Sequence, residues 1–151
     1  MAIANEPNET GVPNHLKTIN PDTIEWKKKD DQYWHNVLTT DRFDVCRGAG
    51  TERPFSGKYC HTQSDGDYFC YCCGQKLFAG GSKFDSGTGW PSFSDAAVPG
   101  AVIEIKDTSH GMVRTEVRCS RCNAHLGHVF DDGPPPTGRR FCINSICLYK
   151  P

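Results

Sequence analysis

Residues 101–130 read AVIEIKDTSHGMVRTEVRCSRCNAHLGHVF and contain the clearest structural pattern in the chain. Apolar and polar side chains alternate over residues 102–106, which predicts a strand because successive side chains in a strand point to opposite faces. A turn at residues 107–111 leads into a second strand at 112–118, and residues 126–130 predict a third. The stretch therefore indicates an antiparallel β structure.

Strand signals continue on both sides of this stretch. Tyr68-Phe69-Cys70 begins a strand after an Asp65-Gly66 turn, and residues 139–148 predict the last strand. Residues 131–138 contain Asp-Asp-Gly and three consecutive prolines, so we expect a loop there. The 15 glycines and 10 prolines, with 36% hydrophobic residues, favour a turn-rich fold of short elements.

The N-terminal part of the chain carries a helical signal. Asn20-Pro21 is a typical helix start, and residues 21–38 predict a helical segment with a break near Asp30-Asp31. Residues 1–19 are polar and interrupted by prolines and a glycine, which predicts a flexible tail. The length of 151 residues suits one domain at 20–151, mainly β, with a short helical segment at its start.

Composition and charge exclude several classes of function. With 17 basic and 18 acidic residues, the formal charge is −1, which is not the basic footprint of a nucleic-acid binder. We expect no membrane segment, because no apolar run approaches the roughly 18 residues that a span needs. The first residues resemble neither a secretory signal nor a transit peptide, so we expect a cytoplasmic protein, and a monomer by default.

Two Cys-x-x-Cys pairs, each following a predicted strand, account for four of the nine cysteines. Two thiolates of one tight turn can bind the same ion, and two such turns form a closed tetrahedral site of the structural zinc type. Cys72 could replace a neighbour, but adjacent cysteines give poorer geometry. Buried thiols or a single redox pair are the alternatives. The predicted zinc ligands are Cys70, Cys73, Cys119 and Cys122.

The segment Arg139-Arg-Phe-Cys-Ile-Asn-Ser145 carries a candidate reactive thiol. Strand alternation places Arg140, Cys142 and Asn144 on one face, with Phe141 and Ile143 on the other. A nearby cation favours the ionised sulfur, so Arg140 can stabilise a thiolate at Cys142. The ordinary alternative is a core cysteine on a half-buried strand.

Two further segments contain polar and aromatic candidates for the same site. His125-Leu-Gly-His128 precedes the acidic Asp131-Asp132 loop, and we interpret the histidines as proton donors rather than metal ligands. Trp90 lies in a glycine-flanked turn. A lone tryptophan is usually a core residue, but here the flanking Gly87, Gly89 and Pro91 allow its indole face to hold a small apolar group at a surface cleft.

Six blocks of this sequence carry a family pattern: residues 50–57, the first cysteine pair, 83–93, 119–122, 125–134 and 140–145. In order and content, these blocks resemble the B-class methionine sulfoxide reductases. The resemblance covers about residues 20 to 148. It implies a β-tent fold of two antiparallel sheets, a structural zinc ion, and reduction of the R epimer of methionine sulfoxide in oxidised proteins and peptides, which is a repair reaction.

The resemblance also implies a role for each matching residue. Cys142 would be the nucleophile and would become a sulfenic acid, and Trp90 would pack on the methyl group of the substrate. A second thiol would condense with the sulfenic acid, and thioredoxin or a similar thiol reductant would reduce the disulfide. The residues that would line the sulfoxide pocket are His125, His128, Asp132, Arg140 and Asn144.

One position departs from the family pattern. Many members have a resolving cysteine in the turn before the tryptophan, where this chain has Thr88. Resolution would then need another thiol, or an external reductant would act directly on the sulfenic acid. Cys46 lies in a mobile-looking segment followed by Gly48 and Gly50, so we favour it over Cys60 as the alternative.

Three other classes of protein remain as alternatives from the sequence. A zinc-stabilised binding module on the same scaffold would not need Cys142, Arg140 and Asn144 on one face with Trp90 nearby. A zinc-ribbon nucleic-acid binder is disfavoured by the balanced charge and the wide spacing of the cysteine pairs. A disulfide oxidoreductase would use Cys70 and Cys73, which bound zinc would block.

Overall fold

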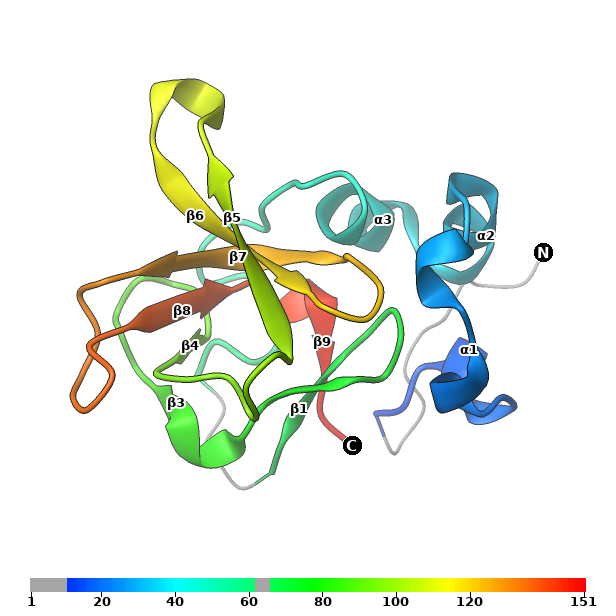
Figure 1. Cartoon of the computed structure of the whole chain (residues 1–151), viewed down its shortest axis with the longest axis horizontal. Coiled ribbons are helices and arrows are strands. Elements are labelled where there is room, and N and C mark those ends of the chain that lie inside the picture. The colour runs from blue at the N-terminus through cyan, green and yellow to red at the C-terminus, as the bar shows by residue number, and fades with distance from the viewer. Residues whose placement is uncertain (1–10, 62–65) are drawn as a thin grey trace.

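The computed structural model describes residues 11–61 and 66–151 (Figure 1). The strands form two antiparallel sheets, with the orders β3-β4-β8-β7-β6-β5 and β2-β1-β9. This confirms the predicted mainly β fold. The strands are β1 (Tyr68–Cys70), β2 (Lys76–Phe78), β3 (Lys83–Phe84), β4 (Ser92–Phe93), β5 (Val102–Asp107), β6 (Arg114–Cys119), β7 (His125–Phe130), β8 (Arg140–Ile143) and β9 (Leu148–Tyr149).

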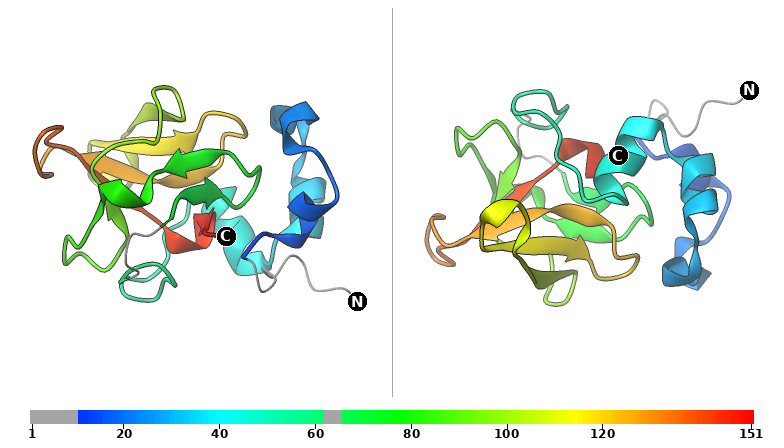
Figure 2. Two further views of the ribbon diagram at one scale, coloured as in Figure 1. Left: turned by 90° about the horizontal axis from the view of Figure 1, so that it is seen from below. Right: turned by 90° about the horizontal axis from the view of Figure 1, so that it is seen from above.

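The helices are short, and α1 to α3 gather at one side of the sheets (Figure 2). Within the described ranges, none of them has the length and apolar character needed to cross a membrane. The α-helices are α1 (Asn14–Lys17), α2 (Asp31–Val37) and α3 (Thr40–Cys46), and the 3-10 helices are η1 (Pro21–Thr23), η2 (Trp26–Lys28), η3 (Gly80–Ser82), η4 (Ser109–Gly111) and η5 (Ser145–Cys147).

The hairpin predicted from residues 101–118 is present as β5 and β6. The two strands pair continuously from Val102 opposite Cys119 to Asp107 opposite Arg114. His110 and Gly111 both have positive φ angles, which lets the short helix η4 reverse the chain. The tip of this hairpin projects from the rest of the molecule (Figure 1).

Aromatic side chains from both sheets form the core between them. The ring of Phe78 on β2 stacks on that of Phe93 on β4, with centroids 4.4 Å apart. Tyr68 on β1 meets Phe93 edge-on at 5.1 Å, and all three side chains are fully buried. Burial of large aromatic side chains is a major source of folding free energy, so these contacts hold the sheets together.

The prediction of one final strand over residues 139–148 is wrong in its second half. β8 ends at Ile143, η5 interrupts the chain, and β9 joins the smaller sheet beside β1. The cause is the carboxylate of Glu52, which accepts hydrogen bonds of 2.9 Å from the backbone amides of both Ser145 and Ile146. These bonds satisfy amides that a continuous strand would present to a neighbour.

The predicted helical segment at 21–38 is divided into η1, η2 and α2. The side chain of Asn20 accepts a bond from Asp22, and that of Asp30 caps α2 at the expected break.

Helix α3 was not predicted. Leu16 is buried in the core, so the packed part of the domain begins before the predicted boundary at residue 20. Residues 1–10 of the predicted tail, and Asp65 of the predicted turn, lie outside the described residues.

Candidate active site and metal centre

The four cysteines of the two pairs form one cluster at the ends of two strands. Cys70 is the last residue of β1, in the smaller sheet, and Cys119 is the last residue of β6, in the larger sheet. In each turn the backbone amide four residues later bonds back to that cysteine, from Gly74 and from Asn123. Gly74 and Asn123 have φ angles of 81° and 65°, so the two turns close in the same way.

The spacing of the four sulfur atoms suits a tetrahedral metal ion. All four lie within 4.8 Å of one another, and the Sγ atoms of Cys73 and Cys119 are 3.5 Å apart. Thiolates bound at about 2.3 Å around a tetrahedral zinc ion are about 3.8 Å apart. Burial raises the pKa of the Cys70 thiol well above its ordinary value, so a cation is needed to stabilise this group as a thiolate.

The surroundings of the cluster support anionic sulfur. Arg47 approaches Cys122, with Nη1 3.7 Å from the sulfur and Nη2 donating to the carbonyl oxygen at 3.0 Å. Gln75 donates to the sulfur of Cys119 at 3.7 Å. Cys72 is not part of the four-sulfur group, which agrees with the sequence interpretation. Because Cys70 and Cys73 are fully buried, they are unsuited to disulfide exchange with a partner.

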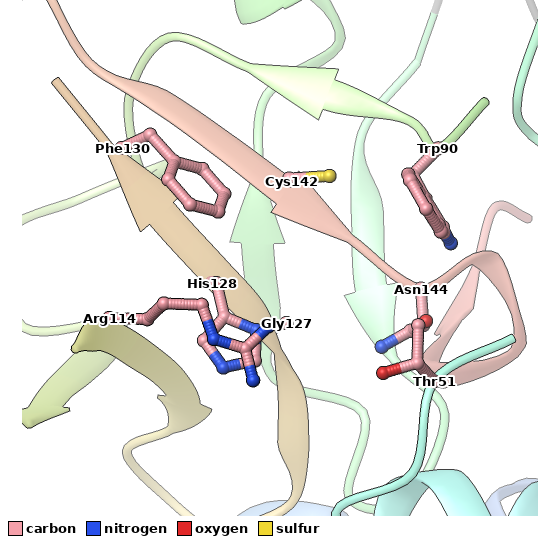
Figure 3. A pocket seen from close by; sticks show the side chains of 8 residues that line it. All are labelled: Thr51, Trp90, Arg114, Gly127, His128, Phe130, Cys142 and Asn144. Atoms are coloured by element: carbon pink, nitrogen blue, oxygen red, sulfur yellow. The ribbon is translucent and has the colours of Figure 1, made fainter. Parts of the chain in front are cut away.

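Cys142 lies in a separate pocket on the larger sheet (Figure 3). All nine cysteines are in the described part of the chain, and Cys142 is the only one that is not buried. Its strand β8 lies between β4 and β7, which places it opposite Ser92 and opposite His128. The residues lining the pocket are Thr51, Trp90, Arg114, Gly127, His128, Phe130, Cys142 and Asn144.

Two aromatic side chains form apolar walls around the sulfur. Figure 3 shows the Cys142 side chain between the rings of Phe130 and Trp90. The indole Nε1 of Trp90 donates to the carbonyl oxygen of Glu52 at 3.0 Å, which fixes the ring with one face available to the pocket. The arrangement can hold a small apolar group next to the thiol.

A β-bulge brings the two histidines together. Val117 of β6 pairs with Gly127 of β7, but the next residue, Arg118, pairs with His125. Leu126 is therefore an extra residue in β7. In a regular strand, residues three apart point to opposite faces. Here both rings lie on one face, with centroids 5.6 Å apart. His128 lines the Cys142 pocket, and both histidines line an adjoining polar cleft.

A scan of family models matches the SelR domain to residues 38–150. The chain belongs to this family. It is 57% identical over 125 residues to the peptide methionine sulfoxide reductase MsrB of Pseudomonas fluorescens, a match that covers 83% of this chain and 96% of that protein. It is 61% identical over 115 residues to the Pseudomonas putida protein of the same name, covering 76% and 88%. The MsrB protein of Saccharophagus degradans is 58% identical over 121 residues, covering 80% and 90%. The resemblance to the B-class reductases is confirmed.

In this SelR domain, burial raises the pKa of the Cys142 thiol from its ordinary value. The charge of Arg140 and hydrogen bonds from the Thr88 hydroxyl and from Arg140 lower it, but only in part. The expected stabilisation of the thiolate by Arg140 is therefore present, but burial outweighs it in the free protein. Thr88, at the position of the missing cysteine, directly neighbours the nucleophile candidate.

Three of the predicted pocket residues mainly hold neighbouring groups in place: Arg140, Asp132 and Asn144. Arg140 Nε donates to a carboxylate oxygen of Asp132 at 2.9 Å, and Asp132 is itself exposed. Asn144 lines the pocket, but its amide nitrogen donates to the Leu126 carbonyl at 3.0 Å and its oxygen accepts from the backbone of Glu52. Both ends of the Asn144 amide therefore bind backbone, which fixes this side chain beside the pocket.

The segment around Cys46, interpreted as mobile from the sequence, is helical. Cys46 ends helix α3, is buried, and its sulfur lies 3.2 Å from that of Cys147, away from the pocket. This helix begins at an N-terminal cap, Thr39, whose side chain accepts a hydrogen bond from the Arg42 amide. Cys60 is also buried, and its thiol lies within electrostatic range of Glu52 and Asp85.

Sequence reasoning did not identify Thr51, Arg114 or Phe130 as pocket residues. Thr51 and Phe130 lie within blocks that resemble the family, so the blocks contained a signal for both. Arg114 lies in none of the six blocks. Its only signal is strand alternation, which places it on the same face of β6 as Glu116.

We predict that Cys119→Ser loses the bound metal and lowers the thermal midpoint by about 10 °C or more, because metal binding in such a site contributes directly to folding. Metal analysis of the purified protein and thermal unfolding measure both effects. Cys72→Ser is the matched control, since it removes a buried thiol from the turn of the other cysteine pair but no ligand. Full metal content in Cys119→Ser would contradict the assignment.

We predict that Arg140→Gln moves the alkylation of Cys142 to higher pH by about one unit, because the variant loses the cation that favours the thiolate. The rate of iodoacetamide labelling at Cys142, followed by peptide mass spectrometry across pH, measures the shift. Arg139→Gln is the control, because Arg139 pairs with Glu104 on the other side of the strand. Equal profiles for the two variants would refute this role of Arg140.

Proposed function

We propose that this SelR domain reduces the R epimer of methionine sulfoxide in oxidised proteins and peptides, with Cys142 as the nucleophile. One observation carries the proposal: the only cysteine that is not buried lies between two aromatic rings and opposite a histidine. Relatives 57–61% identical carry the name peptide methionine sulfoxide reductase. A binding module would not require this combination.

The pocket residues suit the three parts of a sulfoxide group. The methyl group packs on the face of Trp90, the sulfur lies over the Cys142 thiol, and the oxygen points toward the polar side at His128 and Arg114. A chiral sulfoxide is distinguished by contacts with its separate substituents, so these walls give epimer selectivity. The R preference itself follows from membership of the B class.

The reduction step exchanges one sulfur–oxygen bond for another. The Cys142 thiolate attacks the sulfoxide sulfur and forms a sulfur–sulfur bond, while His128 protonates the oxygen. The oxygen then moves as hydroxide from the methionine sulfur to the cysteine sulfur as the sulfur–sulfur bond breaks. The products are the methionine thioether and a sulfenic acid on Cys142. The methionine sulfur gains two electrons and the cysteine sulfur loses two. His128 then recovers its proton from solvent.

The other predicted site residues position or stabilise the groups that react in this step. Arg140 favours the thiolate form of Cys142, and Asp132 holds the guanidinium of Arg140 in place. His125 lies beside His128, and Asn144 ties the Glu52 loop to β7. These roles are those implied by the family resemblance, modified by the contacts that each side chain makes.

The sulfenic acid is recycled by a second thiol. Of the two internal candidates, we favour Cys60 over Cys46, because the sulfur of the buried Cys46 lies 3.2 Å from that of Cys147. Condensation of the sulfenic acid with that thiol releases water and forms a disulfide, which thioredoxin or a similar dithiol reduces by exchange. An external thiol acting directly on the sulfenic acid is the alternative.

We propose zinc as the ion of the four-cysteine site. Four sulfur ligands with no open position suit a structural zinc ion and leave no place for substrate. Cys70, Cys73, Cys119 and Cys122 would hold the ion, and its contribution is to join the two sheets rather than to take part in the reaction. We propose that the protein works as a monomer.

The first test is the reduction of peptides that carry each sulfoxide epimer, with dithiothreitol and then with thioredoxin as the electron source. We expect turnover of the R epimer alone, and loss of at least about a hundredfold in Cys142→Ser because no other exposed thiol is available. The control is Cys147→Ser, which removes a buried thiol from the next element. No turnover of either epimer by reduced, metal-loaded protein would favour the binding module.

We also predict that Thr88→Cys introduces a resolving thiol next to Cys142. After one turnover without reductant, mass spectrometry should find a disulfide between positions 88 and 142, because the side chain of residue 88 already contacts the Cys142 sulfur. The matched control is Ser86→Cys, which introduces a thiol two residues earlier in the same turn. A free thiol at position 88 beside an accumulated sulfenic acid would show that the contact is too distant.

A further inference from the structure

Asp107, the last residue of β5, binds three neighbours of the candidate site. One carboxylate oxygen, Oδ2, is 2.8 Å from Nε2 of His128 and 3.4 Å from Nη2 of Arg114. The other, Oδ1, accepts the backbone amide of Ser109 at 2.9 Å. The side chains of Asp107 and His128 are only 17% and 12% exposed, so water competes weakly for this pair.

The position of Asp107 follows from the sheet. Asp107 is opposite Arg114 across the β5–β6 pair, and His128 lies on β7, the strand on the other side of β6. A side chain at the end of β5 therefore reaches across β6 to the histidine that faces Cys142 on β8. Arg114 and His128, which both approach Oδ2 of Asp107, are on the same side of the pocket in Figure 3.

A second carboxylate makes a similar set of contacts with the other histidine. Glu116 accepts from Nδ1 of His125 at 2.7 Å and from two guanidinium nitrogens of Arg118, each at 3.0 Å. Of the two histidines, His128 lines the Cys142 pocket and His125 does not. Burial lowers the pKa of His125, and Glu116 offsets this only in part, so His125 is neutral near pH 7. This leaves His128 as the histidine suited to donate a proton.

We propose that Asp107 is a positioning residue for sulfoxide reduction, whose carboxylate holds the His128 imidazole beside Cys142 in the protonated form. An anionic partner at hydrogen-bond distance favours the charged imidazole. With Nε2 bonded to Asp107, the other ring nitrogen of His128 carries the proton that the sulfoxide oxygen takes. The proposal rests on the proposed function, because it assigns the source of that proton.

The expected pH dependence follows from this arrangement. The step consumes a proton held by His128, and a carboxylate at hydrogen-bond distance favours the protonated imidazole, so removal of that carboxylate makes the rate fall at a lower pH. Hydrogen bonds from Ser109 and His128 keep the pKa of Asp107 below its ordinary value, so the carboxylate stays ionised throughout this range. The charged and titratable groups that face His128 are Asp107 on β5, Arg114 and Glu116 on β6, His125 on β7, and Arg140 and Cys142 on β8.

The test compares Asp107→Asn with the reduced wild-type protein. Single-turnover reduction of a peptide with the R sulfoxide is followed from about pH 5.5 to about pH 9. We expect the alkaline fall in rate to move down by about one pH unit, which makes the variant about tenfold slower above neutral pH and nearly equal to wild type at low pH. Asp107→Glu restores the charge and should return the fall to its original pH.

Glu104→Gln is the matched control, because it removes the same charge from the same strand at a side chain paired with Arg139. Its pH profile should equal that of the wild type. An Asp107→Asn profile that coincides with wild type, or a loss that is uniform across pH, would overturn the proposal, since a merely structural role does not depend on protonation. If the wild-type protein reduces neither epimer, the proposed function itself fails.

Discussion

The packing of this domain depends on the four buried cysteines that join its two sheets. One pair ends β1 in the smaller sheet, and the other ends β6 in the larger sheet. The smaller sheet has only three strands, and two or three short strands are rarely stable alone. A metal ion held by both pairs would add a second connection to the aromatic contacts between the sheets.

The candidate site uses the larger sheet as a rigid support. Cys142 and His128 face each other on adjacent central strands, while Trp90 is fixed by the carbonyl of Glu52. The carboxylate of the same Glu52 accepts hydrogen bonds from two backbone amides of η5, so the chain leaves the strand after Asn144. One residue therefore sets both a wall of the pocket and the point where the chain leaves the sheet. Such preorganisation lets the reacting groups meet without a rearrangement.

Local patterns in the sequence predicted the hairpin, the two cysteine turns and the face of β8 that carries Cys142, since each depends on residues close in the chain. The pairing of His125 with His128 could not be derived in this way, because it needs the extra residue Leu126 that only the neighbouring strand reveals. The end of β8 depends on a carboxylate some ninety positions earlier. Helix α3 was missed because its signal, the cap at Thr39, lies in a polar segment that resembles a loop.

The position of β9 has a consequence for the order in which the domain is assembled during synthesis. Strand β1, which carries Cys70, lies between β2 and β9. Leu148 and Tyr149 pair with Cys70 and Phe69, so the sheet around the first cysteine pair is incomplete until residues 148–149 have been made. Contacts between such distant parts of a chain form late and slowly. Residues 70–147 are therefore made before the framework of the four-cysteine cluster closes, and its thiols would stay accessible to a metal ion until that moment.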